Sequence, residues 1–309
     1  MGKIYSSIEE LVGNTPMLRL SAIERHLGLG CGLYAKLESC NPSGSAKDRV
    51  ASAMIDRAEA MGLLKKGGTV IEATSGNTGI GLARVAAVRG YRAIIVMPDT
   101  MSAERRALVS AYGAEIALSN GKEGMAGAIR LARTIAERTE GSYIPDQFTN
   151  PANPEIHYNT TAKEIWRDMD GDIDVFVAGV GSGGTIGGVY RYLKEQNEAI
   201  EVVAVEPESS AVLSGGAAGP HSLQGIGAGF VPLAAAERPF DRVITVKDGD
   251  AFEYTRLLGR CEGLLCGISS GAALWAACEL ARDEAYRNKN IVVLLPDTGE
   301  RYLSTGIFG

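Results

Sequence analysis

Short runs of β-branched and apolar residues alternate along this chain with stretches in which apolar residues recur at helical spacing. The short runs predict strands, and the stretches that follow them predict helices. The strands predicted in this way are residues 69–73, 93–97, 115–118, 174–178, 202–205, 243–246 and 291–295. The predicted helices are residues 77–89, 103–112, 122–138, 185–195, 251–261 and 270–285. Such alternation predicts an α/β fold, in which helices cover both faces of parallel sheets.

The two series of strands and helices meet at residues 148–154, where two prolines and two asparagines break any hydrophobic periodicity. A chain of 309 residues is also long enough for two domains. We therefore expect two three-layer domains with mostly parallel sheets, a smaller one of residues 41–148 and a larger one of residues 1–40 plus 149–309. Ligands of such sheets bind beyond the carboxyl ends of strands, so the turns that follow the strands are candidate sites.

Composition and charge narrow the classes of function. A net charge of −6 argues against nucleic acid and against an anionic membrane surface as partners. No apolar run reaches the length of a membrane span, and the first residues lack the apolar core of a signal peptide. The five cysteines include no CxxC pair and the three histidines are scattered. We therefore expect no metal site and a cytoplasmic protein with reduced thiols.

One lysine stands at the start of a predicted helix, in residues 41–49, Asn-Pro-Ser-Gly-Ser-Ala-Lys-Asp-Arg. The first four residues are turn formers, and Ser45 can cap the helix that follows. Lys47 then lies in the first turn, near the positive end of the helix dipole, where a cation is disfavoured. A lysine whose ammonium form is destabilised can serve as a neutral amine, which Schiff-base chemistry requires.

A glycine-rich turn at residues 179–184 lies between a predicted strand and a predicted helix. Its pattern fits GxGxxG, and Glu206 stands at the end of the next strand, where a dinucleotide fold holds a ribose. An NAD-dependent dehydrogenase is therefore one interpretation. The same N–H groups at a helix N-terminus also suit a cofactor with a single phosphate. The hydroxyl groups of Ser182 and Thr185 favour that second interpretation.

Two further turns carry clustered polar side chains. Residues 74–79, Thr-Ser-Gly-Asn-Thr-Gly, place neutral hydrogen-bond donors at a helix start, which is what a substrate carboxylate needs. A helix cap would explain only one of these side chains. Residues 267–271, Gly-Ile-Ser-Ser-Gly, place Ser269 and Ser270 at the start of the last predicted helix, where Ser270 is interpreted as a cap or packing residue.

The lysine segment and these turns, in this order, resemble the cysteine synthases (O-acetylserine sulfhydrylases), which are fold-type II pyridoxal phosphate enzymes with a tryptophan synthase β-like fold. Further similar segments are residues 12–17, 146–151, 224–229 and 296–305. The resemblance implies pyridoxal 5′-phosphate as cofactor, anchored by the larger domain. The residues implied to bind it are Lys47, Asn77, Gly181, Ser182, Gly183, Gly184, Thr185 and Ser269. Asn77 would contact the ring oxygen and Ser269 the pyridine nitrogen, although the sequence does not exclude Ser270 for the second role.

The resemblance also implies a reaction and a substrate-binding loop on the smaller, mobile domain. The residues implied to bind substrate are Thr74, Ser75, Thr78, Gln147, Gly225, Gly227 and Ala228, of which the first four receive its carboxylate. Lys47 would remove the α-proton of O-acetylserine, acetate would leave, and sulfide would add to give cysteine. The implied protein partners are a second copy of this chain and the C-terminal tail of serine acetyltransferase.

Several alternatives share this fold and cofactor. They are cystathionine β-synthase-type replacement, dehydration of serine or threonine, and the use of O-phosphoserine. The loop 224–229 contains no arginine for a phosphate leaving group, which favours the acetyl ester. From other classes, the dehydrogenase remains an alternative, whereas an idle binding homologue would have lost Lys47.

Overall fold

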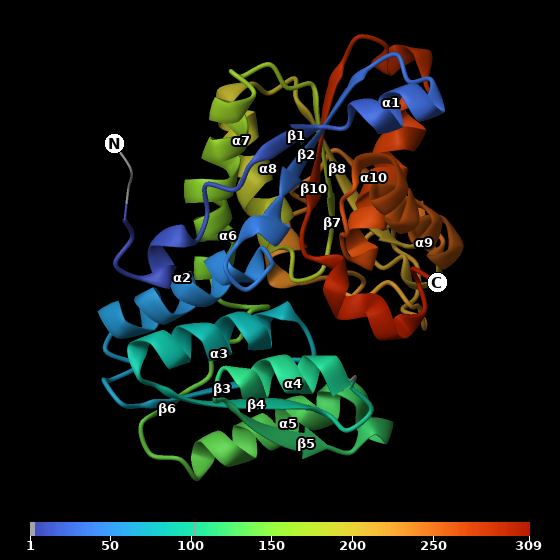
Figure 1. The fold of residues 1–309 in the computed structure, drawn as a ribbon. Helices are drawn as coiled ribbons and strands as arrows, with labels where there is room; N and C mark the ends of the chain where they lie inside the picture. The colour runs from blue at the N-terminus through green and yellow to red at the C-terminus, as the bar shows by residue number, and fades with distance from the viewer. Residues whose placement is uncertain (1–3, 102) are drawn as a thin grey trace. The chain divides into compact units, whose positions relative to one another are not determined.

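The computed structural model describes residues 4–101 and 103–309. The chain forms two compact units, one of Met1–Val12 with Lys47–Asn153 and one of Gly13–Ala46 with Pro154–Gly309. Each unit is built on its own sheet, with helices around it (Figure 1). Among the described residues, none of the helices combines the length and the hydrophobicity of a membrane span.

The first unit contains a four-stranded parallel sheet in the order β5-β4-β3-β6. Its strands are β3 (Thr69–Ala73), β4 (Arg92–Pro98), β5 (Glu115–Ser119) and β6 (Ser142–Tyr143). Its helices are η1 (Ile8–Leu11), α2 (Lys47–Ala60), α3 (Asn77–Arg89), α4 (Ala103–Ala111), η3 (Gly121–Glu123) and α5 (Gly124–Glu137). Helix α3 packs on the face of Ile95, and α5 packs on the opposite face, on Ile94 and Val96. The unit therefore has helices on both faces of its sheet (Figure 1).

The second unit contains a six-stranded sheet in the order β1-β2-β10-β7-β8-β9, in which only the β1–β2 pair is antiparallel. Its strands are β1 (Met17–Arg19), β2 (Gly32–Leu37), β7 (Val175–Gly179), β8 (Glu201–Pro207), β9 (Arg242–Val246) and β10 (Asn290–Leu295). Its α-helices are α1 (Ser21–Leu27), α7 (Ala162–Asp168), α8 (Gly184–Gln196), α9 (Asp248–Leu257) and α10 (Ile268–Ala281). A short helix, α6 (Ala152–Ile156), lies where the chain passes from the first unit to the second.

Short 3-10 and π turns complete the second unit. They are η2 (Glu38–Cys40), η4 (His157–Thr161), η5 (Glu208–Ser210), η6 (Leu233–Ala235), η7 (Leu258–Glu262), η8 (Glu284–Tyr286) and η9 (Gly299–Thr305). The sheet between these elements is buried on both faces. Along β7, Val175 and Val177 belong to one hydrophobic core, with α9 and α10, while Phe176 and Ala178 belong to the other, with α7 and α8. Burial on both faces explains why these strands are continuous apolar runs.

The α/β class and the mostly parallel sheets predicted from the sequence are confirmed. Every predicted strand and helix is present, and most of their ends shift by one to four residues. The expected helix 270–285, for example, is α10 at Ile268–Ala281, and the end of the expected helix 251–261 is the π turn η7. The domain bounds 41–148 and 1–40 plus 149–309 stay a prediction.

Strands β1, β2 and β6 are absent from the sequence prediction. Strand β2 has a neighbouring strand on each side in its sheet, yet it carries a lysine, Lys36, with no exposed surface. The Lys36 ammonium donates to the Thr15 carbonyl oxygen at 2.6 Å and pairs with Glu164 at 3.0 Å. A charged residue that is buried only because distant residues pair with it breaks the apolar pattern on which the prediction relies.

Candidate active site

Lys47 is the first residue of α2, and its side chain is half-buried. The next residue, Asp48, is fully buried and places an acid in the first turn of the helix. Arg84 of α3 pairs with Asp48, with 2.8 Å between Nε and Oδ1, and donates to Ser52 Oγ at 2.9 Å. These contacts tie the start of α2 to α3. The placement of Lys47 at a helix N-terminus disfavours its charged form.

Gly81 brings the first turn of α2 close to α3. A Cβ at Gly81 would lie 2.8 Å from the Lys47 carbonyl oxygen and 3.0 Å from Ala51 Cβ, so only glycine allows this approach. Helix α3 begins at Asn77, directly after the turn that carries Thr74 and Ser75. Within the first unit, the structure therefore brings the helix start at Lys47 together with the helix that follows the predicted carboxylate-binding turn.

The turn at residues 74–79 leaves the start of α3 available to an anion. Its N-cap is Gly76, and among the described residues no side chain caps the helix. Thr74 Oγ1 accepts the Gly76 N–H at 3.2 Å, and Arg105 of α4 donates to the Ser75 carbonyl oxygen at 2.8 Å. Thr74 is buried, whereas Ser75 and Asn77 are partly exposed. Uncapped N–H groups and hydroxyls at a helix start suit a carboxylate.

Thr78 and Gln147 are joined although they are far apart in sequence. The Thr78 hydroxyl donates to Gln147 Oε1 at 2.6 Å, and both side chains are buried. Because Thr78 occupies the oxygen of the amide, the Gln147 nitrogen, with its two N–H donors, is the part left to bind an anion. The predicted substrate residues of the first unit thus form one cluster.

The main chain of Gln147 rests on an acid that sequence reasoning missed. Glu72 of β3 accepts the N–H groups of Asp146 at 3.0 Å and of Gln147 at 3.4 Å. Burial raises the pKa of Glu72 to about 7, against the lowering effect of these two hydrogen bonds. The signal in the sequence was a single acid inside an otherwise apolar strand, residues 69–73.

In the second unit, residues 181–185 form a cup between β7 and α8. A Cβ at Gly181 would lie 2.3 Å from the Gly225 carbonyl oxygen, so no side chain fits there. Gly183, with φ 79°, is the N-cap of α8, and no side chain among the described residues caps this helix. Ser182 is buried beside these glycines, and Gly184 is the first residue of α8. The donors of the cup are main-chain N–H groups and hydroxyls, which fit a phosphate.

His157 is a second residue that sequence reasoning missed. Its Nε2 lies 3.2 Å from the Thr185 hydroxyl, and its Nδ1 lies 2.9 Å from the Thr161 hydroxyl. The imidazole is fully buried, and its hydrogen bond orients Thr185 at the edge of the cup. No sequence pattern pointed to this residue, because a lone histidine has no recognisable spacing.

The loop at residues 224–229 and the start of α10 lie beside this cup. A Cβ at Gly225, where φ is 99°, would lie 3.4 Å from Ser269 Oγ, and the Gly227 N–H donates to the Val180 carbonyl oxygen at 3.0 Å. Ala228 is partly exposed in the same loop. The structure therefore brings together the predicted residues of the second unit that surround Gly181.

The two serines of the third turn differ in their surroundings. Ser270 Oγ is fully buried and has no hydrogen-bond partner among the described residues. The N-cap of α10 is Gly267, so the capping role that the sequence offered for Ser270 is wrong, and packing remains. Ser269 keeps a small exposed surface of 3% and lies beside Gly225, which favours Ser269 as the residue that meets a ligand.

Glu206, the acid on which the dinucleotide interpretation depends, is already saturated. Its carboxylate accepts the N–H groups of Leu213 at 2.7 Å and Ser214 at 2.9 Å, and the Ser214 hydroxyl at 2.6 Å. It is 1% exposed and therefore does not face a ribose. The donor set thus fits a phosphate held by backbone and hydroxyl groups, as in pyridoxal phosphate, and lacks the ribose ligand of a dinucleotide site.

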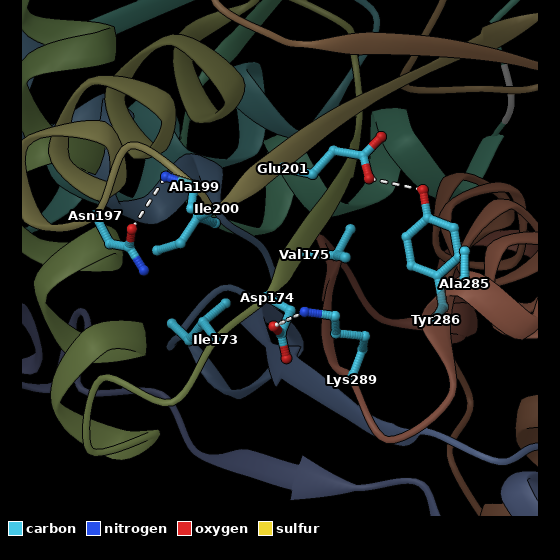
Figure 2. Close-up of a pocket in the computed structure, with 10 residues that line it drawn as sticks. All are labelled: Ile173, Asp174, Val175, Asn197, Ala199, Ile200, Glu201, Ala285, Tyr286 and Lys289. Carbon is cyan, nitrogen blue, oxygen red and sulfur yellow. Dashed lines mark hydrogen bonds and ion pairs between the residues drawn. The ribbon is translucent and has the colours of Figure 1, made fainter.

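A cavity of 310 Å³ in the second unit lies away from these turns (Figure 2). It lies where β7, β8 and β10 begin, whereas the cup and the turns follow the opposite ends of strands. Figure 2 shows that its polar groups face one another. Asp174 pairs with Lys289 at 2.7 Å, and Tyr286 donates to Glu201 at 2.7 Å. None of the predicted site residues lines it.

Comparison with known proteins points to the same cofactor as the donor groups of this site. Residues 8–297 match the family described as pyridoxal-phosphate dependent enzyme. A cysteine synthase of Staphylococcus aureus (strain Mu50 / ATCC 700699) is 49% identical over 307 residues, which cover 99% of this chain and 98% of the relative. The crystal structure of cysteine synthase (OASS) from Entamoeba histolytica has a TM-score of 0.95 and 44% identity, and covers 99% of this chain and 91% of that chain.

A third similar structure is the O-acetylserine dependent cystathionine β-synthase from Helicobacter pylori, with a TM-score of 0.93, 40% identity and full coverage of both chains. These findings confirm the resemblance to cysteine synthases, the enzymatic class and the pyridoxal phosphate cofactor expected from the sequence. The chain, over nearly its whole length, belongs to the pyridoxal-phosphate dependent enzyme family.

Proposed function

We propose that this enzyme makes L-cysteine from O-acetyl-L-serine and sulfide and releases acetate. The observation that carries the proposal is the near-full-length identity with the cysteine synthase of S. aureus. The carboxylate-binding cluster in the first unit supports it, because a free amino acid presents such a carboxylate. Bound pyridoxal phosphate supplies an electron sink, which makes the α-proton of an amino acid acidic and favours loss of a β-substituent.

Lys47 is the residue that we assign to hold the cofactor and to move the α-proton. The helix dipole at the N-terminus of α2 destabilises the ammonium form of Lys47, and its Nζ would accept that proton. The cup of Gly181, Ser182, Gly183, Gly184 and Thr185 would hold the phosphate, and Asn77 the ring oxygen. Ser269 would place a neutral hydroxyl at the pyridine nitrogen, so that the ring withdraws fewer electrons than it would opposite a carboxylate.

The substrate carboxylate would bind at the start of α3. Thr74 and Ser75 offer hydroxyls there, and Gln147 offers the amide nitrogen that its bond from Thr78 leaves available. In this arrangement Thr78 orients Gln147, because its hydroxyl proton is already donated. Gly225, Gly227 and Ala228 would line the substrate side of the cofactor.

The protein partners follow from the resemblance, whereas the location and the excluded partners follow from the composition and charge of the sequence. We propose a homodimer that can bind the C-terminal tail of serine acetyltransferase and that works in the cytoplasm without nucleic acid or membrane. Sedimentation of the purified protein, with and without a peptide of that tail, tests the first two statements.

A second candidate activity is cystathionine formation from O-acetylserine and homocysteine. The observation that favours it is the similarity to the H. pylori O-acetylserine dependent cystathionine β-synthase along the whole chain. O-phosphoserine remains the other alternative donor, and the saturated Glu206 argues against the dehydrogenase.

The deciding experiment is a set of parallel assays on the purified holoenzyme. We expect cysteine and acetate in equal amounts from O-acetylserine and sulfide, at a higher kcat/KM than cystathionine from O-acetylserine and homocysteine. Faster turnover with homocysteine would replace cysteine synthesis by the second candidate. Faster turnover of O-phosphoserine would instead identify a phosphate leaving group.

A further inference from the structure

Glu72 is a buried acid to which the proposed reaction assigns no role. It lies in β3, between Ile71 and Ala73, and is 3% exposed. Its two carboxylate oxygens accept one N–H group each, Oε2 from Asp146 and Oε1 from Gln147. One carboxylate therefore holds two consecutive main-chain donors of the turn that carries Gln147.

This turn is fixed from several sides. Asp146 has φ 50°, a left-handed conformation that residues other than glycine seldom adopt. The Asn150 N–H donates to the Asp146 carbonyl oxygen at 2.9 Å, and the Thr149 hydroxyl donates to its side chain at 2.7 Å. Asn153 donates to the Gln147 carbonyl oxygen at 2.8 Å. The surroundings must impose such a conformation, and on the N–H side of Gln147 they do so through Glu72.

We propose that Glu72 is a positioning residue for the substrate carboxylate, because it fixes the main chain from which the Gln147 amide reaches the start of α3. The inference rests on the proposed function, in which Gln147 receives that carboxylate. Two hydrogen bonds orient the side-chain nitrogen of Gln147. Glu72 accepts the main-chain N–H of Gln147, and the Thr78 hydroxyl donates to the side-chain oxygen.

Ionisation of Glu72 makes this positioning depend on pH. Burial, with a smaller contribution from the nearby charge of Asp146, raises its pKa to about 7. The other titratable groups in this region are Tyr143 of β6, whose pKa Glu72 helps to raise, and Arg57 of α2, which acts on Tyr143 in the opposite direction. When Glu72 takes up a proton, one of its oxygens becomes a donor, and one of the two N–H bonds is lost. Binding of the carboxylate therefore weakens as the pH falls through about 7.

The test compares Glu72→Gln with the wild type. Glutamine has the shape of glutamate but offers a single acceptor oxygen, so it imitates the protonated acid. The matched control is Glu115→Gln in the same unit, where the glutamate is exposed and pairs with Arg92 at 2.6 Å. Three quantities are measured on the holoenzymes from pH 6 to 8. They are KM and kcat for O-acetylserine, the Kd of L-alanine by calorimetry, and hydrogen exchange at the amides of residues 146 and 147.

In Glu72→Gln we expect KM and the alanine Kd at pH 8 to rise about tenfold, which corresponds to one lost hydrogen bond, with a smaller change in kcat. The increase of Kd between pH 8 and pH 6 in the wild type should be largely absent in the variant. The two amides should exchange faster, and Glu115→Gln should match the wild type throughout. Unchanged exchange together with unchanged Kd in Glu72→Gln would overturn the proposal.

The same experiment separates this inference from the proposed function. A wild type that makes no cysteine refutes the proposed reaction, whereas alanine binding and amide exchange still decide the role of Glu72. If Glu72→Gln does not fold, the wild type decides alone. Alanine affinity and protection of the two amides must both fall as the pH drops below 7, and a pH-independent affinity overturns the proposal.

Discussion

Gly81 and Lys47 touch through main-chain atoms, because Gly81 has no side chain to keep α3 away from the first turn of α2. A methyl group at residue 81 would lie 2.8 Å from the Lys47 carbonyl oxygen, well inside van der Waals contact. The position of the lysine relative to the turn at residues 74–79 therefore depends on a glycine that itself takes no part in the chemistry.

Gly81→Ala should destabilise the protein even though alanine is the better helix former. Overpacking costs about 1–3 kcal/mol, against a gain of about 1 kcal/mol in helix propensity. Urea unfolding and the KM for O-acetylserine measure the two effects. The control is Gly249→Ala in α9, where the added methyl group meets nothing within 4 Å, so stability should stay equal or rise. If Gly81→Ala proved as stable as Gly249→Ala, then α2 would be able to move away from α3 without a loss of stability.

Lys47→Ala should remove the attachment point of the cofactor. After borohydride reduction, mass spectrometry of wild-type peptides should find a pyridoxyl group on Lys47, and the variant should carry none. Lys65→Ala, which changes an exposed lysine, should retain the label. A pyridoxyl group on any other lysine would refute the assignment of Lys47.

Thr78→Val should loosen Gln147. The variant keeps the volume of threonine but leaves Gln147 Oε1 without its donor, and a buried unsatisfied acceptor costs about 1–3 kcal/mol. We expect KM for O-acetylserine to rise about tenfold or more while the absorbance of the bound cofactor is unchanged. Thr78→Ser, which restores the hydroxyl, should recover most of the affinity. A valine variant with the KM of the wild type would show that the Thr78 bond does not position Gln147.

Substitutions at Ser269 and Ser270 should affect different properties of the enzyme. Ser269→Asp would place a carboxylate at the pyridine nitrogen, so the visible absorbance should shift and acetate release should slow, whereas Ser269→Ala should have a milder effect. Ser270→Ala removes a buried hydroxyl that has no partner among the described residues, so stability should stay equal or increase. Spectral changes in Ser270→Asp without any in Ser269→Asp would reverse the assignment.

The stability of the wild type should fall as the pH rises from about 4.5 to about 7 because of Glu72. In this range the unfolded chain ionises Glu72 while the folded protein keeps it protonated, so the folded state binds more protons. The free energy of unfolding of Glu72→Gln relative to wild type should therefore increase by up to roughly 3 kcal/mol across this range. Urea titrations at pH 5 and pH 8 measure the difference. A constant difference would show that the pKa of Glu72 is close to its ordinary value.

The elements that the sequence predicted correctly are those whose signal is local. Residues 93–97 and 291–295 are uniform apolar runs, and the turns that follow strands β3 and β7 are marked by glycines and hydroxyl side chains. The partner of Glu72, by contrast, is 74 residues away in the chain, and that of Thr78 is 69 residues away. Arg105 and His157 also matter only through the carbonyl or hydroxyl that the fold places beside them. Pairings of this kind leave no periodicity, so they become visible only in the structure.

The pairing of β2 with β10 has a consequence for the order in which the protein can fold during synthesis. Residue 32 pairs with residue 290, so the central part of the six-stranded sheet is incomplete until almost the whole chain has left the ribosome. The four strands of the other sheet all lie between residues 69 and 143 and are available much earlier. Contacts over short sequence separations form faster than distant ones. When the four strands of the other sheet have been made, the nascent β2 therefore has only β1 to pair with, and Glu164, the ion-pair partner of Lys36, has not yet been added.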